Sequence, residues 1–157
     1  MAVTVSIETP LQDEVRVLVG ELNDHLLPLS PIEFQFKMTV EQMAGDDTTV
    51  FVARNEAGEA VGIGALKVIS ANEAEVKRMY TRAVARGRGV GKALLARIEA
   101  EARNAAIRVL RLETGVHQTA AIGLYEGWGF RRREPFGHYA DLPPHSIATS
   151  AFYEKLL

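Results

Sequence analysis

The sequence contains no cysteine among its 157 residues. This absence excludes disulfides, thiolate metal ligands and a covalent acyl-cysteine intermediate. The four histidines (His25, His117, His138 and His145) show neither the H-x-H nor the i,i+4 spacing that is typical of metal sites. We therefore expect no metal ion in this protein.

Long apolar runs and an excess of one charge are also missing. No stretch approaches the about 20 apolar residues that a transmembrane helix needs. The N-terminal residues MAVTVSI lack the basic segment and the long apolar core of a secretion signal. With 18 basic and 20 acidic residues, the formal net charge of −2 gives no sign of nonspecific nucleic-acid binding. We expect a cytoplasmic protein, with neither a membrane nor nucleic acid as a partner.

Apolar residues make up 47% of the chain, which is enough for a core in a chain of single-domain size. We expect one domain over residues 1–157. Apolar spacing predicts strands at 3–8, 49–54, 60–70, 74–80, 109–114, 130–134 and 148–156, and helices at 11–26, 40–44, 90–106 and 119–128. The order β-α-α-β-β-β-α-β-α-β-β predicts an α/β fold, a mixed sheet flanked by helices.

The most informative stretch is a glycine-rich loop, RGRGVG at residues 86–91, between a predicted strand and a predicted helix. Glycine lets a backbone approach a ligand closely, because it has no Cβ. The N-terminus of the following helix offers unpaired N–H groups and the positive end of the helix dipole. Together these features are typical of a phosphate or pyrophosphate site, so we expect a nucleotide-like cofactor.

Two familiar phosphate loops can be tested by spacing. A Walker loop is excluded, because no glycine stands five residues before Gly91 and Ala93 replaces the Ser or Thr after Lys92. The dinucleotide pattern G-x-G-x-x-G lacks its third glycine in either register, where Lys92 and Leu94 stand. Glu113 lies at the distance of a ribose-binding acid, so a nicotinamide-dependent oxidoreductase remains a weaker alternative.

The pattern [Arg/Gln]-x-x-Gly-x-[Gly/Ala], met by Arg86, Gly89 and Gly91, resembles the acetyl-CoA pyrophosphate loop of the GNAT superfamily of N-acetyltransferases. A second stretch, AIGLYEGWGF at residues 121–130, resembles the A-x-x-L-Y-x-x-x-G-F signature of the same family. The resemblance covers essentially the whole chain, most strongly from 61 to 130. It implies a twisted sheet whose fourth and fifth strands splay apart. It also implies an acetyl-CoA-dependent enzyme that acetylates the amine of a small-molecule or amino-acid-like acceptor by direct attack in a ternary complex.

The resemblance assigns the loop amides to the pyrophosphate. It assigns the backbone of the fourth strand to the pantetheine arm, which pairs like an added strand. Gln118 stands where similar sequences carry an asparagine that touches the cofactor. The expected cofactor-binding residues are Met79, Tyr80, Thr81, Arg86, Gly87, Arg88, Gly89, Val90, Gly91, Lys92, Gln118 and Tyr125.

For catalysis, the resemblance makes Tyr125 the general acid that protonates the leaving thiolate, a role that a phenol can fill. Glu75 is the expected general base, and Glu113 is its competitor. A noncatalytic acyl-CoA-binding module is the alternative from a different functional class.

Two further stretches, LETG at 112–115 and PFGHY at 135–139, resemble a small-substrate branch of the superfamily. We expect the segments 29–36 and 134–146 to line the acceptor side of the cleft. The expected substrate-contacting residues are Leu29, Glu33, Thr114, His138 and Tyr139. The sequence is compatible with a homodimer.

Overall fold

The computed structural model describes residues 2–31 and 35–157. The strands are β1 (Thr4–Ile7), β2 (Thr48–Arg54), β3 (Ala60–Val68), β4 (Glu73–Thr81), β5 (Val109–Gly115), β6 (Arg131–Arg133) and β7 (Ser150–Leu156). The helices are α1 (Asp13–Leu26), α2 (Val40–Met43), α3 (Val90–Asn104) and α4 (Thr119–Gly127). This order confirms the predicted α/β arrangement. None of the helices described is both long and apolar enough to cross a membrane.

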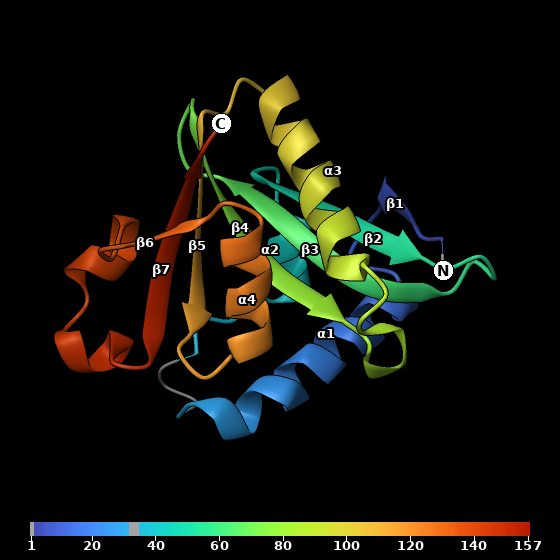
Figure 1. Ribbon diagram of the computed structural model, residues 1–157, viewed down its shortest axis with the longest axis horizontal. Helices are drawn as coiled ribbons and strands as arrows, with labels where there is room; N and C mark the ends of the chain where they lie inside the picture. Colours follow the sequence, from blue (N-terminus) through green and yellow to red (C-terminus); the bar gives the residue numbers. More distant parts are fainter. Residues whose placement is uncertain (1, 32–34) are drawn as a thin grey trace.

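The seven strands form one sheet in the order β1-β2-β3-β4-β5-β7-β6. All neighbouring strands are antiparallel except β4 and β5, which run parallel. These two strands pair only from Glu73 to Glu75, opposite Val109 to Arg111, and then diverge. Figure 1 shows them together at one end and apart at the other, where α4 stands beside the opening. The predicted splay between the fourth and fifth strands is therefore confirmed.

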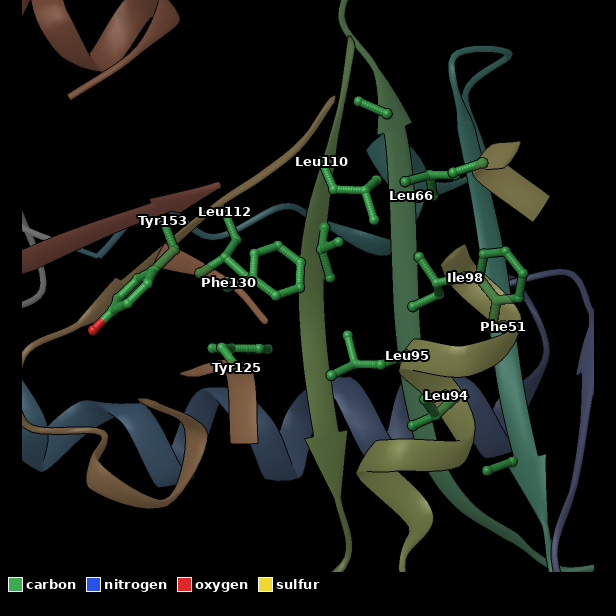
Figure 2. Packing of buried hydrophobic residues seen from close by; sticks show 14 of the residues in the cluster. Phe51, Leu66, Leu94, Leu95, Ile98, Leu110, Leu112, Tyr125, Phe130 and Tyr153 are labelled. Atoms are coloured by element: carbon green, nitrogen blue, oxygen red, sulfur yellow. The ribbon is translucent and has the colours of Figure 1, made fainter. Parts of the chain in front are cut away.

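Two apolar clusters cover the two faces of the sheet. On one face, α3 and α4 pack with the strands, and Figure 2 shows Leu94, Leu95 and Ile98 of α3 in the same cluster as Tyr125 of α4. On the other face, α1 and α2 form the second cluster with β2 and β3. The residues of α1 predicted from helical spacing are buried there, namely Val15, Leu18, Val19 and Leu22. Residues of α1 and α4, which belong to opposite layers, line one groove near the split between β4 and β5.

A β-bulge interrupts β4 next to this split. The register of β3 on β4 shifts between Ile63 and Ala65, so Arg78 and Met79 both lie opposite Gly64. Arg78 has a φ of 56°, in the left-handed region that non-glycine residues seldom occupy. A Cβ on Gly64 would lie 2.6 Å from the Met79 sulfur, so any larger residue there would displace the Met79 side chain. The bulge thus turns Met79 into the core and re-aims the backbone on the open side of β4.

The short elements differ from the prediction in their ends. Thr39 caps α2 as expected, in a capping box with Gln42. The last strand starts at Ser150, later than predicted, because Pro144–Ile147 forms a 3-10 turn before it. A third apolar cluster, formed by Phe136, Tyr139 and Phe152, fixes this C-terminal segment against β7.

Candidate active site

A groove follows the glycine-rich loop from β4 to the start of α4. Every residue expected to bind the cofactor lines this groove except Arg88. The groove also takes Leu22 and His25 from α1, which the sequence interpretation did not include. Helix α1 reaches it because the sheet is open beneath the loop, a contact between distant segments that no local pattern signals.

The N-terminus of α3 opens onto this groove. Its N-cap, Gly89, has a φ of 81°, and no side chain caps the helix. The first helical hydrogen bond runs from the Ala93 N–H to the Gly89 carbonyl at 3.0 Å, which leaves the preceding N–H groups without helical acceptors. Apart from the glycine itself and its chain neighbours, no heavy atom of the described residues lies within 4 Å of the position of a Cβ on Gly87 or Gly89. An anion such as a pyrophosphate therefore fits the space and the polarity of the loop.

Gly91 also packs against α4, a contact that the motif alone did not indicate. A Cβ on Gly91 would lie 2.8 Å from Cδ2 of Leu124, so a side chain there would displace the Leu124 side chain of α4. The glycine therefore lets the Leu124 side chain pack closely against the start of α3. Its place in the motif reflects helix packing as well as access to a ligand.

The free edge of β4 forms the floor of the groove. Beyond Glu75, this edge has no partner strand in β5. The Met79 side chain is partly buried against the core, and Met79 lines the groove. Arg86 ties the loop to the strand, because its Nε donates to the Thr81 carbonyl at 3.1 Å and its guanidinium lies 5.8 Å from the Tyr80 ring centre.

An inner cavity lies at the split and joins the groove. Met79, Gln118 and Tyr125 line both the cavity and the groove. The cavity is walled by β4, β5, the C-terminal end of α1 and the segments around Ser30, Gln35 and Thr149. Of the expected acceptor residues, Leu29 and Thr114 line it, and Glu33 lies outside the described residues.

Charged side chains gather where β4 and β5 separate. Side chains on one face of a strand recur every second residue, so Lys77 and Glu113 follow the last paired residues Glu75 and Arg111 on the same face. The Glu75 carboxylate is 4% exposed, and its Oε2 accepts hydrogen bonds from the Tyr139 hydroxyl at 2.8 Å and from the Lys77 ammonium at 3.3 Å. Glu75 is thus a buried carboxylate that already has two partners.

Glu113 differs from Glu75 in its partners. Burial raises the pKa of Glu113 to about 7, although the Ser150 hydroxyl donates to its Oε2 at 2.7 Å and the charge of Lys77 acts in the opposite direction. A carboxyl group with such a pKa exchanges protons near neutral pH. The sequence placed Glu113 correctly on the fifth strand but carried no sign of this environment.

Tyr125 stands at the junction of the groove and the cavity. Burial raises the pKa of its phenol above the ordinary value, and the charge of Glu113 raises it further. The hydroxyl therefore keeps its proton at neutral pH and is a donor. The ring packs edge-on against Phe130, with 5.9 Å between the ring centres, which holds it in place.

Tyr139 and His138 line a neighbouring pocket together with Lys37, rather than the inner cavity. Tyr139 is fully buried among aromatic rings and reaches the site through its hydroxyl on Glu75. The structure thus connects Tyr139 to the site through Glu75. In the part of the chain that the structure describes, no three His, Asp or Glu side chains gather closely enough to hold a metal ion.

Comparison with known proteins assigns this geometry to a family. Residues 19–130 match the model of the acetyltransferase (GNAT) family. Over 99% of its length, the chain is 42% identical to an IAA acetyltransferase of Azospirillum brasilense, of which it covers 98%. It is 35% identical over 82% of its length to YsnE, an uncharacterized N-acetyltransferase of Bacillus subtilis, of which it covers 87%.

Solved structures show the same fold. A proposed acyl-CoA N-acyltransferase from Klebsiella pneumoniae superposes with a TM-score of 0.78 at 34% identity, covering 99% of this chain and 97% of that one. The PaiA N-acetyltransferase of Thermoplasma acidophilum, solved in complex with coenzyme A, superposes with a TM-score of 0.76 at 18% identity over the full length of both chains. The chain described here belongs to the acetyltransferase (GNAT) family.

Proposed function

We propose that this protein transfers the acetyl group of acetyl-CoA to the amine of a small-molecule or amino-acid-like acceptor, by direct attack in a ternary complex. The observation that carries the proposal is that Met79, Gln118 and Tyr125 line both the groove and the inner cavity. A donor in the groove and an acceptor in the cavity would meet at Tyr125. The chain has no cysteine that could carry the acetyl group between two half-reactions.

The groove suits acetyl-CoA, the co-substrate of the acetyl transfer, in two places. The uncapped N–H groups at the start of α3 would take the pyrophosphate. The free backbone edge of β4 at Met79 and Thr81 would pair with the pantetheine amides, as an added strand does. The bulge interrupts the β3–β4 ladder, so a backbone N–H at the bulge is a candidate to polarise the thioester carbonyl.

We assign the proton acceptor to Glu113 rather than to Glu75. A base needs a pKa near the working pH and a free lone pair, and burial places the pKa of Glu113 at about 7. Glu75 already accepts bonds from Lys77 and Tyr139, which hold it in position beside the acceptor. Glu75 and Tyr139 are in this proposal positioning residues, and Glu113 removes the proton from the acceptor ammonium.

The freed amine nitrogen then attacks the thioester carbonyl carbon. As the C–N bond forms, the C–S bond breaks, and the sulfur leaves with the electron pair of that bond. Tyr125 donates its phenolic proton to this sulfur, because its raised pKa keeps the proton available at neutral pH. The nitrogen loses its second proton to water as the amide forms, and the products are the N-acetylated acceptor and CoA. Solvent then returns a proton to Tyr125 and takes one from Glu113, so the cycle releases one proton.

Family membership decides between the alternatives raised by the glycine spacing. The match to an acetyltransferase model over residues 19–130 leaves the nicotinamide-dependent oxidoreductase without support. The name of the Azospirillum relative, an IAA acetyltransferase, is consistent with a small-molecule acceptor. Only a measurement of turnover distinguishes the proposed enzyme from a noncatalytic acyl-CoA-binding module.

The test is the release of CoA from acetyl-CoA in the presence of a panel of amino acids, polyamines and simple amines. Because the protein has no cysteine, a thiol reagent reports free CoA with no signal from the enzyme. We expect amine-dependent release that Tyr125→Phe strongly reduces. Binding of acetyl-CoA by calorimetry without release by any amine would instead support the noncatalytic module.

A further inference from the structure

Arg78 is buried, and no carboxylate of the described residues forms an ion pair with it. It is 8% exposed, lies at the bulge of β4 and lines the inner cavity. One guanidinium nitrogen donates to Asn23 Oδ1, a neutral acceptor on α1. Its Nε is buried and has no hydrogen-bond partner among the described residues. Since an arginine carries five N–H donors, most of its bonding capacity is unused.

Two neighbouring carboxylates are already paired with other partners. Glu75 binds Lys77 at 3.3 Å, and both Lys77 and Lys37 also line the cavity. Glu21 of α1 binds Arg82 at 3.1 Å and accepts from the Tyr80 hydroxyl. Arg78 lies beside the last turn of α1, so the partial negative charge of that helix end offsets only part of its charge. Burial lowers the pKa of Arg78 to about 10, so the guanidinium remains charged at neutral pH.

A second unmet group lines the same cavity. The Nε2 of Gln35 donates to the carbonyls of Leu26 and Ser30, each at 2.8 Å, which fixes the orientation of the amide. Its Oε1 is then a buried acceptor that has no partner among the residues the structure describes. Three polar groups therefore line the cavity: the Arg78 guanidinium, which has no ion-pair partner among the described residues, the oxygen of Gln35 and the carboxylate of Glu113.

We infer that Arg78 forms an anion subsite in the acceptor cavity, and that the acceptor is an amino carboxylate whose carboxylate pairs with the Arg78 guanidinium. A planar guanidinium binds a carboxylate through two parallel hydrogen bonds, which suits an otherwise unpaired arginine. The amine of the same molecule would face the carboxylate of Glu113 and the oxygen of Gln35. This inference rests on the proposed function and narrows its acceptor to one chemical class.

The first experiment needs no variant. The L-amino acids, their α-carboxamides and the corresponding amines without a carboxyl group are compared as acceptors by CoA release. The carboxamide keeps the shape and the amine but loses the charge. We expect kcat/KM to favour the carboxylate over the matched carboxamide by about 10- to 100-fold, the usual effect of hydrogen bonds to a charged group. Equal or better use of the carboxamides and simple amines would overturn the inference and leave the acetyl transfer intact.

The second experiment places the preference on Arg78. Arg78→Gln is expected to lower kcat/KM for carboxylate acceptors by the same 10- to 100-fold, mainly through KM, and to leave carboxamide acceptors nearly unchanged. Arg78→Lys keeps the charge but cannot form two parallel hydrogen bonds. Its kcat/KM for carboxylate acceptors should lie between the values of the wild type and Arg78→Gln. Arg82→Gln is the matched control, because Arg82 is paired with Glu21 outside the cavity. A uniform loss with every acceptor would mean that Arg78 is only structural.

Thermal stability separates the anion subsite from the catalytic proposal. Amino acids added without acetyl-CoA should raise the Tm of the wild type and not that of Arg78→Gln, because only the wild type gains an ion pair on binding. Such a shift without any CoA release would keep the subsite and refute the acetyl transfer. If no carboxylate-bearing compound supports turnover or shifts the Tm, the subsite itself is refuted. Should Arg78→Gln fail to fold, Arg78→Lys and the wild-type comparison still decide the matter.

Discussion

Replacing Glu113 with glutamine should make the protein more stable and less active. The carboxyl of Glu113 has a pKa of about 7 in the folded protein and 4.5 ordinarily, because burial disfavours its charged form. Glutamine has the same shape and stays neutral at every pH. Its amide oxygen can still accept the hydrogen bond that the Ser150 hydroxyl donates to Glu113 at 2.7 Å. The substitution therefore removes the charge while it leaves the packing in place.

The magnitude follows from proton binding. Between pH 4.5 and 7, folded Glu113 keeps a proton that the unfolded chain has released, so the free energy of unfolding falls as the pH rises through this window. Above pH 7 both states are ionised, and the folded state carries the whole cost of the buried charge. At 1.36 kcal/mol per pKa unit, that cost is about 3 kcal/mol. The Glu113→Gln variant should therefore gain up to about 3 kcal/mol of stability at pH 8 and almost none at pH 4.5.

The assay is urea denaturation of both proteins at several pH values from 4.5 to 8.5, followed by kinetics. If Glu113 is the base, kcat/KM of the wild type should rise with pH through about 7. The variant should lose this rise and about 10²-fold of its rate. Acceptors with different amine pKa values separate the ionisation of the acceptor from that of Glu113. Identical pH dependence of stability in the two proteins would refute the buried-charge argument, and an unaltered rate profile would remove Glu113 as the base.

Four further substitutions test other parts of the site. Tyr125→Phe should keep its affinity for acetyl-CoA in calorimetry and lose about 10²-fold in kcat, and a wild-type kcat would exclude the phenol as acid. Gly89→Asp should abolish acetyl-CoA binding in the same calorimetric assay, since it adds a negative charge and a Cβ at a φ of 81° where a pyrophosphate would bind. Tyr139→Phe removes one of the two hydrogen bonds to Glu75, and should raise the acceptor KM with little change in acetyl-CoA affinity. Glu75→Gln should lower the Tm, because Lys77 then loses its ion-pair partner at 3.3 Å.

The fold could be predicted from the sequence because the signals for its helices, strands and loops are local. Helical spacing of apolar residues and the glycine-rich loop each depend on a few consecutive positions, and all the main helices and strands formed where they were predicted. The groove followed for the same reason, since the loop and the start of α3 are contiguous. Motifs that combine local geometry with a ligand contact are the part of a site that a single sequence reveals best.

The inner cavity could not be predicted from the sequence, because it is formed by segments that are distant in sequence. Arg78, Gln35 and Leu22 meet there only because β4 and β5 separate after Glu75 and α1 covers the opening. One signal was present in the sequence: the strand-like run at 74–80 carries three charged residues, at positions where a central strand is normally apolar. Charged residues within such a strand indicate a break in the sheet, although their partners cannot be predicted from the strand itself.

The buried charges at the split are of two kinds, and stability measurements can separate them. Glu75 and Lys77 satisfy each other, so removing one leaves the other unpaired and should destabilise the fold. Glu113 and Arg78 each lack a countercharge at hydrogen-bonding distance among the described residues, so neutralising either should not destabilise the protein. A fold under selection for stability alone would not retain such unpaired charges, because each one costs free energy until a ligand binds. An acceptor with an amine and a carboxylate would pair with both Glu113 and Arg78. Its binding would then offset the free energy of folding that these two buried charges cost in the empty site.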